Sequence, residues 1–189
     1  MSVSAPVSAP HAPTTTTWKI DTSHTHAEFA VRHLMISTVK GRFADVQGTV
    51  RWDESDFAKS DVEITISVPS IDTREQQRDA HLRSADFFDA ENFPQITFRS
   101  KRIQGKGHSF SIAGDLTIRG TTREVVLDVT SEGRTTDPWG GERAGFSATT
   151  KIKRTEFGLL WNQLLETGGV VVGEDVKISI DAELIKQSS

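Results

Sequence analysis

Residues 112–130 read IAGDLTIRGTTREVVLDVT, and this stretch decides the fold. Apolar and polar residues alternate on both sides of a short turn around Gly120. Successive side chains of a β-strand point to opposite faces, so each half is typical of a strand with one buried and one solvated face. Two such runs joined by a turn predict an antiparallel hairpin.

The same alternation continues along most of the chain from Trp18 onward. In residues 39–52 the apolar positions change parity, which predicts a β-bulge or sharp bend near Ala44–Asp45. Nothing resembles the regular helical crossovers of a parallel sheet. About eight one-faced antiparallel strands predict an all-β barrel or sandwich. Further alternating runs are residues 27–33, 62–68, 96–99, 146–153 and 176–184.

Two segments break the alternation and are predicted to be helical. In residues 73–89, Thr73 and Gln76 have the spacing of a capping box. In residues 159–167, four large apolar residues share one helical face, and two glycines would end the helix. Both segments are expected to cover an end of a barrel. The four apolar residues are Leu160, Trp161, Leu164 and Leu165.

The composition excludes several classes of protein. The chain has 189 residues, a net charge of −4 and no cysteine. The absence of a basic block argues against nucleic-acid binding, and no apolar run approaches the roughly 20 residues of a membrane span. Thiol chemistry and cysteine-ligated metals are excluded. No nucleophile, phosphate-loop or dinucleotide motif is present, so no enzyme is predicted.

The domain organisation is simple. Residues 1–17 consist of small residues, Pro and Thr, apart from Met1 and His11, and are predicted to be a disordered tail. They lack the basic start and apolar run of a secretory signal, so a cytoplasmic location is expected. Residues 18–189 are expected to form a single domain.

Four blocks in order carry a resemblance to a known family. The chain resembles the YceI-like, polyisoprenoid-binding family of lipocalin-like barrels. The resemblance implies an extended eight-stranded antiparallel lipocalin-like β-barrel with short helical segments near one end. The blocks are residues 21–53, which open as DTSHTHAEFAVRH, residues 78–98, residues 114–122 (GDLTIRGTT) and residues 154–176, which open as RTEFG.

The resemblance also implies a function. Members are similar in binding long apolar ligands inside a barrel pore without catalysis, so we expect binding, transport or storage of such a ligand. The expected ligand is a polyisoprenoid, an isoprenoid quinone or a fatty amide-like lipid. No cofactor and no metal are expected, and the resemblance is compatible with a homodimer.

The site residues follow from the inward parity together with the resemblance. At a polar mouth, His33, Arg78 and Asp79 are expected to contact a ligand head group, whereas Arg154 is expected to be structural. His33 could equally be a structural histidine whose ring is hydrogen-bonded within the protein. The expected apolar pore consists of Phe29, Val31, Phe43, Ile64, Ile66, Phe87, Phe88, Phe98, Leu116, Ile118, Phe146, Phe157 and Trp161.

Two alternatives to lipid binding remain at this point. An eight-stranded barrel can be filled by its own side chains, and composition alone favours this structural or stress-response barrel without a ligand. The second alternative is a metal-assisted hydrolase. His24 and His26 form an H-x-H pair that a strand would point to one face, with Glu28 as a third ligand. That face would be solvated.

Overall fold

The computed structural model describes residues 15–166 and 168–188. Most of the predicted tail, residues 1–14, lies outside the described residues. Thr15, Thr16 and Thr17 belong to the first strand, so the sheet begins before the expected boundary at Trp18.

The described chain contains many strands, one α-helix and three short 3₁₀ segments. The elements are β1 (Thr15–Ile20), β2 (His26–His33), β3 (Ser37–Phe43), β4 (Val46–Asp53), η1 (Phe57–Lys59), β5 (Asp61–Ser67), η2 (Val68–Ser70), β6 (Ile71–Asp72), α1 (Gln76–Arg83), β7 (Gln95–Lys106), β8 (Ser109–Ile118), β9 (Thr121–Thr136), β10 (Glu142–Lys153), η3 (Arg154–Phe157) and β11 (Val172–Lys186).

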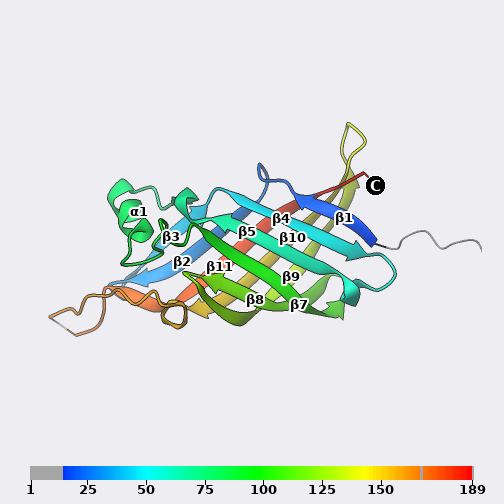
Figure 1. Ribbon diagram of the computed structural model, residues 1–189. Helices are drawn as coiled ribbons and strands as arrows, with labels where there is room; N and C mark the ends of the chain where they lie inside the picture. The colour runs from blue at the N-terminus through cyan, green and yellow to red at the C-terminus, as the bar shows by residue number, and fades with distance from the viewer. Residues whose placement is uncertain (1–14, 167, 189) are drawn as a thin grey trace, which may run out of the picture.

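The strands form one closed antiparallel barrel, seen from the side in Figure 1. Eight strands run in the order β1-β4-β5-β7-β8-β9-β10-β11, and β11 pairs back with β1. The N-terminal part of β11 pairs with β2 instead, so β2, β3 and β6 extend the wall at the end where α1 lies. The predicted eight-stranded barrel is therefore confirmed.

The predicted bend between residues 39 and 52 is present. The chain bends at Ala44, between β3 and β4. Before the bend β3 pairs with β2, and after it β4 pairs with β1 and β5. The bend keeps Phe43 and Val46 both buried, which is what the change of parity requires.

The first predicted helix is shorter than expected and has a different cap. Helix α1 spans only Gln76–Arg83, and the carboxylate of Glu75 accepts from the backbone N–H groups of Gln77 and Arg78. The predicted capping box of Thr73 and Gln76 was wrong, because the Thr73 hydroxyl donates to Asp79 at 2.6 Å instead.

No helix among the described residues has the length and apolarity that a membrane crossing requires.

The second predicted helix was wrong. The chain after Leu159 is an extended excursion that returns to β11, with one bridge between Leu164 and Val170. The Asn162 side chain donates to the Val172 carbonyl at 2.7 Å and accepts from the Val172 N–H at 3.0 Å. These bonds hold the two arms together in place of helical bonds. We call residues 160–166 and 168–171 the flap.

Candidate functional site

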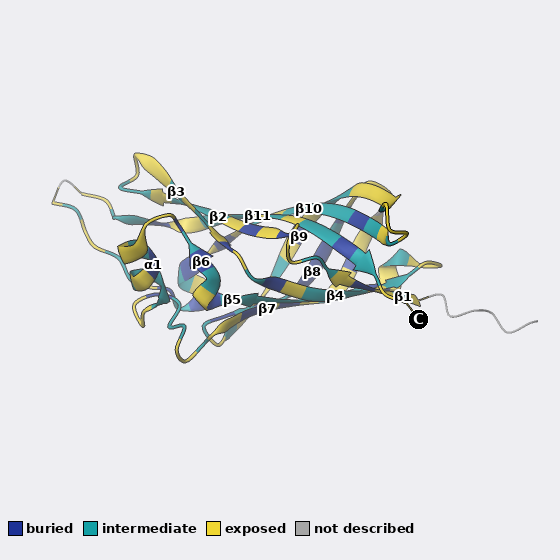
Figure 2. Cartoon of the chain, turned by 90° about the horizontal axis from the view of Figure 1, so that it is seen from above, coloured by how far each residue is buried: buried dark blue, intermediate teal, exposed yellow. Residues whose placement is uncertain are grey.

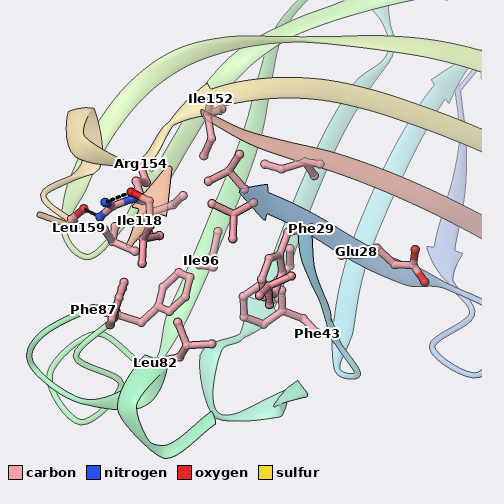
Figure 3. A pocket seen from close by; sticks show the side chains of 18 of the residues that line it. Glu28, Phe29, Phe43, Leu82, Phe87, Ile96, Ile118, Ile152, Arg154 and Leu159 are labelled. Atoms are coloured by element: carbon pink, nitrogen blue, oxygen red, sulfur yellow. Dashed lines mark hydrogen bonds between the residues drawn. The ribbon is translucent and has the colours of Figure 1, made fainter. Parts of the chain in front are cut away.

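A cavity of about 440 Å³ lies inside the barrel at the α1 end. Figure 3 shows the rings of Phe29, Phe43 and Phe87 gathered around it with Ile96 and Ile118. The lining is almost entirely aliphatic and aromatic, and the volume is within the usual range of small-ligand sites. The lining extends to partly exposed residues of α1 and the flap, so the cavity opens at this end.

The inward parity of the strands places most of the predicted pore residues on this cavity. Phe146 instead lines a separate cavity of about 80 Å³, and Phe157 lines neither cavity but is buried in the core. These two assignments to the main pore were wrong. The predicted residues that do line the main cavity are Phe29, Val31, Phe43, Ile64, Ile66, Phe87, Phe88, Phe98, Leu116, Ile118 and Trp161.

Two glycines make room for the rings at the cavity wall. A Cβ at Gly41 would overlap the ring of Phe29, and a Cβ at Gly114 would lie 2.6 Å from the ring of Phe98. Ring centroids are 5.7 Å apart between Phe29 and Phe43. The rings therefore pack closely against the backbone of the cavity wall at β3 and β8.

The opposite end of the barrel interior is packed with aromatic side chains. Trp52 contacts Phe57 and Phe146 at centroid distances of 5.4 and 5.6 Å, and Phe57 contacts Phe110 at 4.7 Å. The 80 Å³ cavity lies among these rings, and it shares Ile64 of β5 with the main cavity. The filled-barrel alternative therefore describes one end of the interior, while the other end is hollow.

Two of the three residues predicted for the polar mouth lie on the cavity. His33 and Arg78 line the cavity, and the His33 ring makes no hydrogen bond to any residue in the described part of the chain. Arg78 donates Nε to the Thr73 hydroxyl at 2.7 Å and Nη2 to the Thr73 carbonyl at 2.8 Å. Asp79 does not line the cavity, because it is buried and accepts from the N–H and hydroxyl of Thr73. Its assignment to the mouth was wrong.

Arg154 is the buried cation of this end, and its expected structural role fits its contacts. Its guanidinium donates to the carbonyls of Gly173 (2.8 Å), Leu159 (2.6 Å), Trp161 (2.9 Å) and Val172 (3.2 Å). Burial lowers the pKa of Arg154. Arg154 therefore ties η3 and the flap to the start of β11, as Figure 3 shows in part.

Further lining residues were not among the predicted site residues. Ile96, Val176 and Ile178 lie on the inward parity of their strands, and that signal could have identified them. His81 and Leu82 line the cavity from α1, and only the helix position reveals them. The His81 ring lies edge-on to Trp161 at 4.8 Å, so α1 and the flap meet over the mouth.

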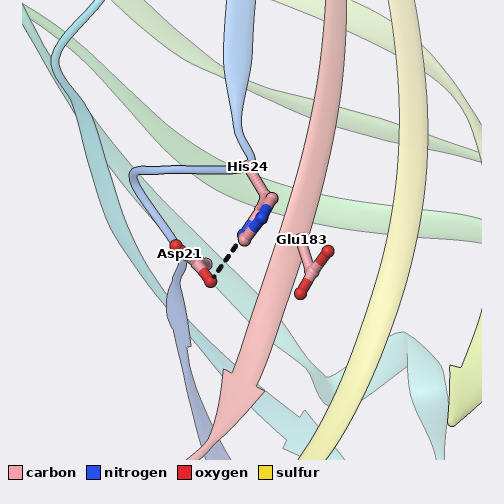
Figure 4. A group of neighbouring side chains, drawn as sticks. All are labelled: Asp21, His24 and Glu183. Atoms are coloured by element: carbon pink, nitrogen blue, oxygen red, sulfur yellow. Dashed lines mark hydrogen bonds and ion pairs between the residues drawn. The ribbon is translucent and has the colours of Figure 1, made fainter. Parts of the chain in front are cut away.

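The H-x-H pair does not form the metal site that the hydrolase alternative requires. His24 lies in a bend before β2 rather than in the strand, whereas His26 is exposed on β2. His24 approaches Asp21 and Glu183 instead, as Figure 4 shows, with Nδ1 3.0 Å from the Asp21 carboxylate. The hydrolase alternative, which needed His24, His26 and Glu28 on one face, therefore has no assembled site.

The acidic side chains beside His24 also form ion pairs with an arginine. Arg143 Nη1 lies 2.8 Å from Asp21 and 2.5 Å from Glu183, and Nε lies 2.8 Å from Asp137. Hydrogen bonds from Ser23, His24 and Arg143 hold the pKa of Asp21 well below its usual range. This cluster is an ion-pair network that joins β1, β10 and β11 at the packed end.

The fold and the cavity define a class of protein: a closed lipocalin-like antiparallel barrel with an apolar chamber open at one end. Residues 18–184 match the model of the YceI-like domain, and the chain belongs to this family. A UPF0312 protein of Staphylococcus aureus is 40% identical over 169 residues, which cover 89% of this chain and 96% of that protein.

Two solved structures share the fold. Burkholderia cenocepacia BcnA has a TM-score of 0.76 and 24% identity, covering 87% of this chain and 98% of that one. A polyisoprenoid binding domain from Saccharophagus degradans has a TM-score of 0.67 and 12% identity, covering 90% of this chain and 98% of that one. At these identities the likeness shows the shared barrel.

Proposed function

We propose that the protein binds the hydrocarbon chain of an isoprenoid-type lipid in its cavity, without catalysis. The observation that carries the proposal is the apolar chamber of about 440 Å³ that opens at the α1 end. Each CH₂ group moved from water into such a chamber contributes about 0.8 kcal/mol. A long chain therefore binds tightly with few polar contacts. The polyisoprenoid binding domain from Saccharophagus degradans, which shares the barrel, supports this ligand class.

The polar groups at the mouth suit an oxygen-rich head group. Arg78 Nη1 donates to no described residue, and the His33 ring is likewise unbonded within the described chain. Both side chains line the cavity at its open end. An arginine donates to phosphate oxygens with charge-assisted hydrogen bonds, whereas a neutral hydroxyl or quinone oxygen gains less from it.

The first test is solvent extraction of the purified protein followed by mass spectrometry of the extract. A polyisoprenoid, isoprenoid quinone or related lipid in stoichiometric amount is the expected result. If the extract is empty, reconstitution with a prenyl alcohol and a prenyl phosphate of equal chain length follows. Failure of both ligands to displace a hydrophobic fluorescent dye from the protein would refute the proposal.

The head-group assignment is tested with Arg78→Gln. Its affinity for the prenyl phosphate is expected to fall roughly tenfold, because one charge-assisted hydrogen bond is lost. Its affinity for the prenyl alcohol should change much less. Arg83→Gln is the matched control, because Arg83 is bonded to the carbonyls of Pro69 and Ile71 and does not line the cavity. Equal losses for both ligands would remove Arg78 from the head-group site.

A further inference from the structure

Four large apolar side chains protrude into solvent around the open end of the barrel. Met35 and Ile36 lie in the turn between β2 and β3, where they are 52% and 80% exposed. Leu160 and Leu164 lie on the flap, where they are 66% and 82% exposed. None of the four lines the cavity. We call these four side chains the apolar rim.

The two parts of the apolar rim lie at the same end of the molecule. The Leu34 N–H donates to the Val171 carbonyl at 2.8 Å, which joins the β2–β3 turn to the flap. Figure 1 places both segments at the α1 end, and Figure 2 shows the β2–β3 turn coloured as exposed. The cavity lining includes neighbours of both segments, such as His33 and Trp161. The rim therefore borders the mouth of the cavity.

The β2–β3 turn has an unfavourable backbone as well as exposed apolar side chains. Leu34 and Met35 have φ values of 50° and 60°, and the Ile36 N–H closes the turn on the His33 carbonyl. Such turns favour Asn-Gly, because a left-handed conformation costs other residues roughly 1–2 kcal/mol each. Leu, Met and Ile at these positions lower the stability of the turn in water in two ways. The backbone is strained, and apolar side chains are exposed to solvent. Strain of this kind is concentrated at functional sites.

The charges around the mouth favour an anionic lipid surface. Arg32 and Arg74 are exposed, Arg78 is partly exposed, and none of the three has an ion-pair partner among the described residues. The Glu75 carboxylate is occupied by the N-terminus of α1. Three exposed carboxylates oppose this trend locally: Glu166 on the flap, Glu28 of the cavity lining and Glu174 near Arg154. Arginines beside apolar loop tips are typical of surfaces that enter the head-group region of a bilayer.

We propose that the open end of the barrel docks on a lipid bilayer, with the apolar rim inserted and the arginines among the head groups. The inference rests on the proposed lipid-binding function and adds the route of the ligand. A long isoprenoid chain is nearly insoluble in water. Docking lets it pass between bilayer and cavity without crossing water. Two protruding tips suit insertion into a soft apolar layer better than the flat face of roughly 800 Å² that a stable dimer needs.

Flotation with lipid vesicles tests the proposal. The wild-type protein is expected to float with phosphatidylcholine vesicles containing phosphatidylglycerol, and less with phosphatidylcholine alone. In Ile36→Gln/Leu164→Gln the vesicle partition coefficient should fall at least roughly tenfold, because two apolar side chains no longer insert. Arg74→Gln should lower it about fivefold on the anionic vesicles and little on the neutral ones.

Trp139→Gln is the matched control. Trp139 is 85% exposed in the turn between β9 and β10, at the opposite end of the barrel. Tryptophan is a strong membrane-interface residue, so a non-specific contact would depend on it. We expect Trp139→Gln to float as the wild type does. Loss of flotation in Trp139→Gln, but not in the rim variant, would overturn the proposal, as would a wild-type protein that floats with neither vesicle.

Two further measurements separate this inference from the proposed function. Dye uptake in solution without vesicles should be equal in the wild type and the rim variant, since the rim does not line the cavity. A wild-type protein that floats but takes up neither dye nor prenyl ligand would refute lipid binding in the cavity and leave docking supported. Sedimentation velocity that shows a dimer dissolved by the rim substitutions would assign the rim to a second copy and overturn docking.

Discussion

The two ends of the barrel use the same alternating strands in opposite ways. At the packed end Trp18 is fully buried and Arg134 lies 3.8 Å from the ring centroid of Trp52. At the open end aliphatic and aromatic side chains surround a cavity, and the β2–β3 turn is strained and apolar. Rings contact one another across the interior at the packed end, whereas at the open end they line a cavity. Ligand access is therefore confined to one end of the barrel interior.

The largest expected effect comes from removing the central ring of the packed end. Trp18→Ala should lower the free energy of unfolding by about 3–5 kcal/mol, because it leaves a cavity between β1 and β4. It also removes the Trp18–Trp52 contact, whose centroid distance is 5.9 Å. Denaturant unfolding followed by fluorescence measures the change.

The matched substitution at the open end is Ile178→Ala. Ile178 faces the existing cavity, so its removal creates little new void and should cost only about 1 kcal/mol. Equal losses of stability in Trp18→Ala and Ile178→Ala would contradict the division of the barrel into a packed and a hollow end.

The second prediction concerns a substitution that fills the cavity at the open end. Ile178→Trp should lower the affinity for a hydrophobic dye or prenyl ligand at least tenfold, which corresponds to about 1.4 kcal/mol. The midpoint of thermal unfolding should change little, because the ring occupies empty space. Val126→Trp is the control, since Val126 is 49% exposed on β9 outside the cavity. Unchanged uptake in a folded Ile178→Trp protein would place the ligand elsewhere.

Much of this comparison could be predicted from the sequence. The alternation of apolar and polar residues in β8 and β9 predicts these strands, and the change of parity predicts the bend at Ala44. Eight of the predicted pore residues line the cavity for the same reason, because residues of inward parity face the interior of any barrel. Phe87, Phe88 and Trp161 also line it but lie outside the strands. Whether the interior is hollow could not be predicted. It depends on the stagger of the strands and on which inward-facing residues lie at the same height along the barrel axis.

The errors have identifiable physical causes. The spacing of Leu160 and Leu164 indicates a helical face, but both side chains are exposed on an extended flap. Asn162, through two bonds to Val172, outweighs that local preference. Asp79 was assigned to the mouth although its carboxylate is bonded to Thr73. Side-chain bonds to nearby backbone compete with regular structure, and periodicity does not detect them.

The third prediction concerns the strain at the open end. Leu34→Asn/Met35→Gly should raise the free energy of unfolding by about 1 kcal/mol, because both new residues tolerate positive φ. Thermal unfolding measures the gain, expected to be roughly 2–4 °C for a protein of this size. Gly133→Asn in β9, which has a φ of 112°, is the control and should give no such gain. A destabilised turn variant would show that Leu34 and Met35 stabilise the turn by their own packing.

The smallest expected effect is at the ion-pair network of the packed end. Hydrogen bonds from Ser23, His24 and Arg143 depress the pKa of Asp21, so the folded state favours its ionised form. The resulting stability is present above the unfolded pKa of about 3.9 and is lost as the pH falls further. Asp21→Asn should therefore lower the free energy of unfolding by about 1 kcal/mol at pH 7 and by less in acid.

His24 has the opposite pH dependence. The hydrogen bond to Asp21 raises its pKa, so its contribution is present below about pH 6.5 and is lost as the pH rises through the folded pKa. Thermal unfolding of the wild type and Asp21→Asn from pH 2 to 8 should thus converge at low pH and differ most between about pH 4 and 6.5, where both contributions are present. Asp181→Asn is the control, because Asp181 is exposed on β11 without an ion pair to any described residue. Parallel curves for the wild type and Asp21→Asn would mean that this network does not anchor the packed end.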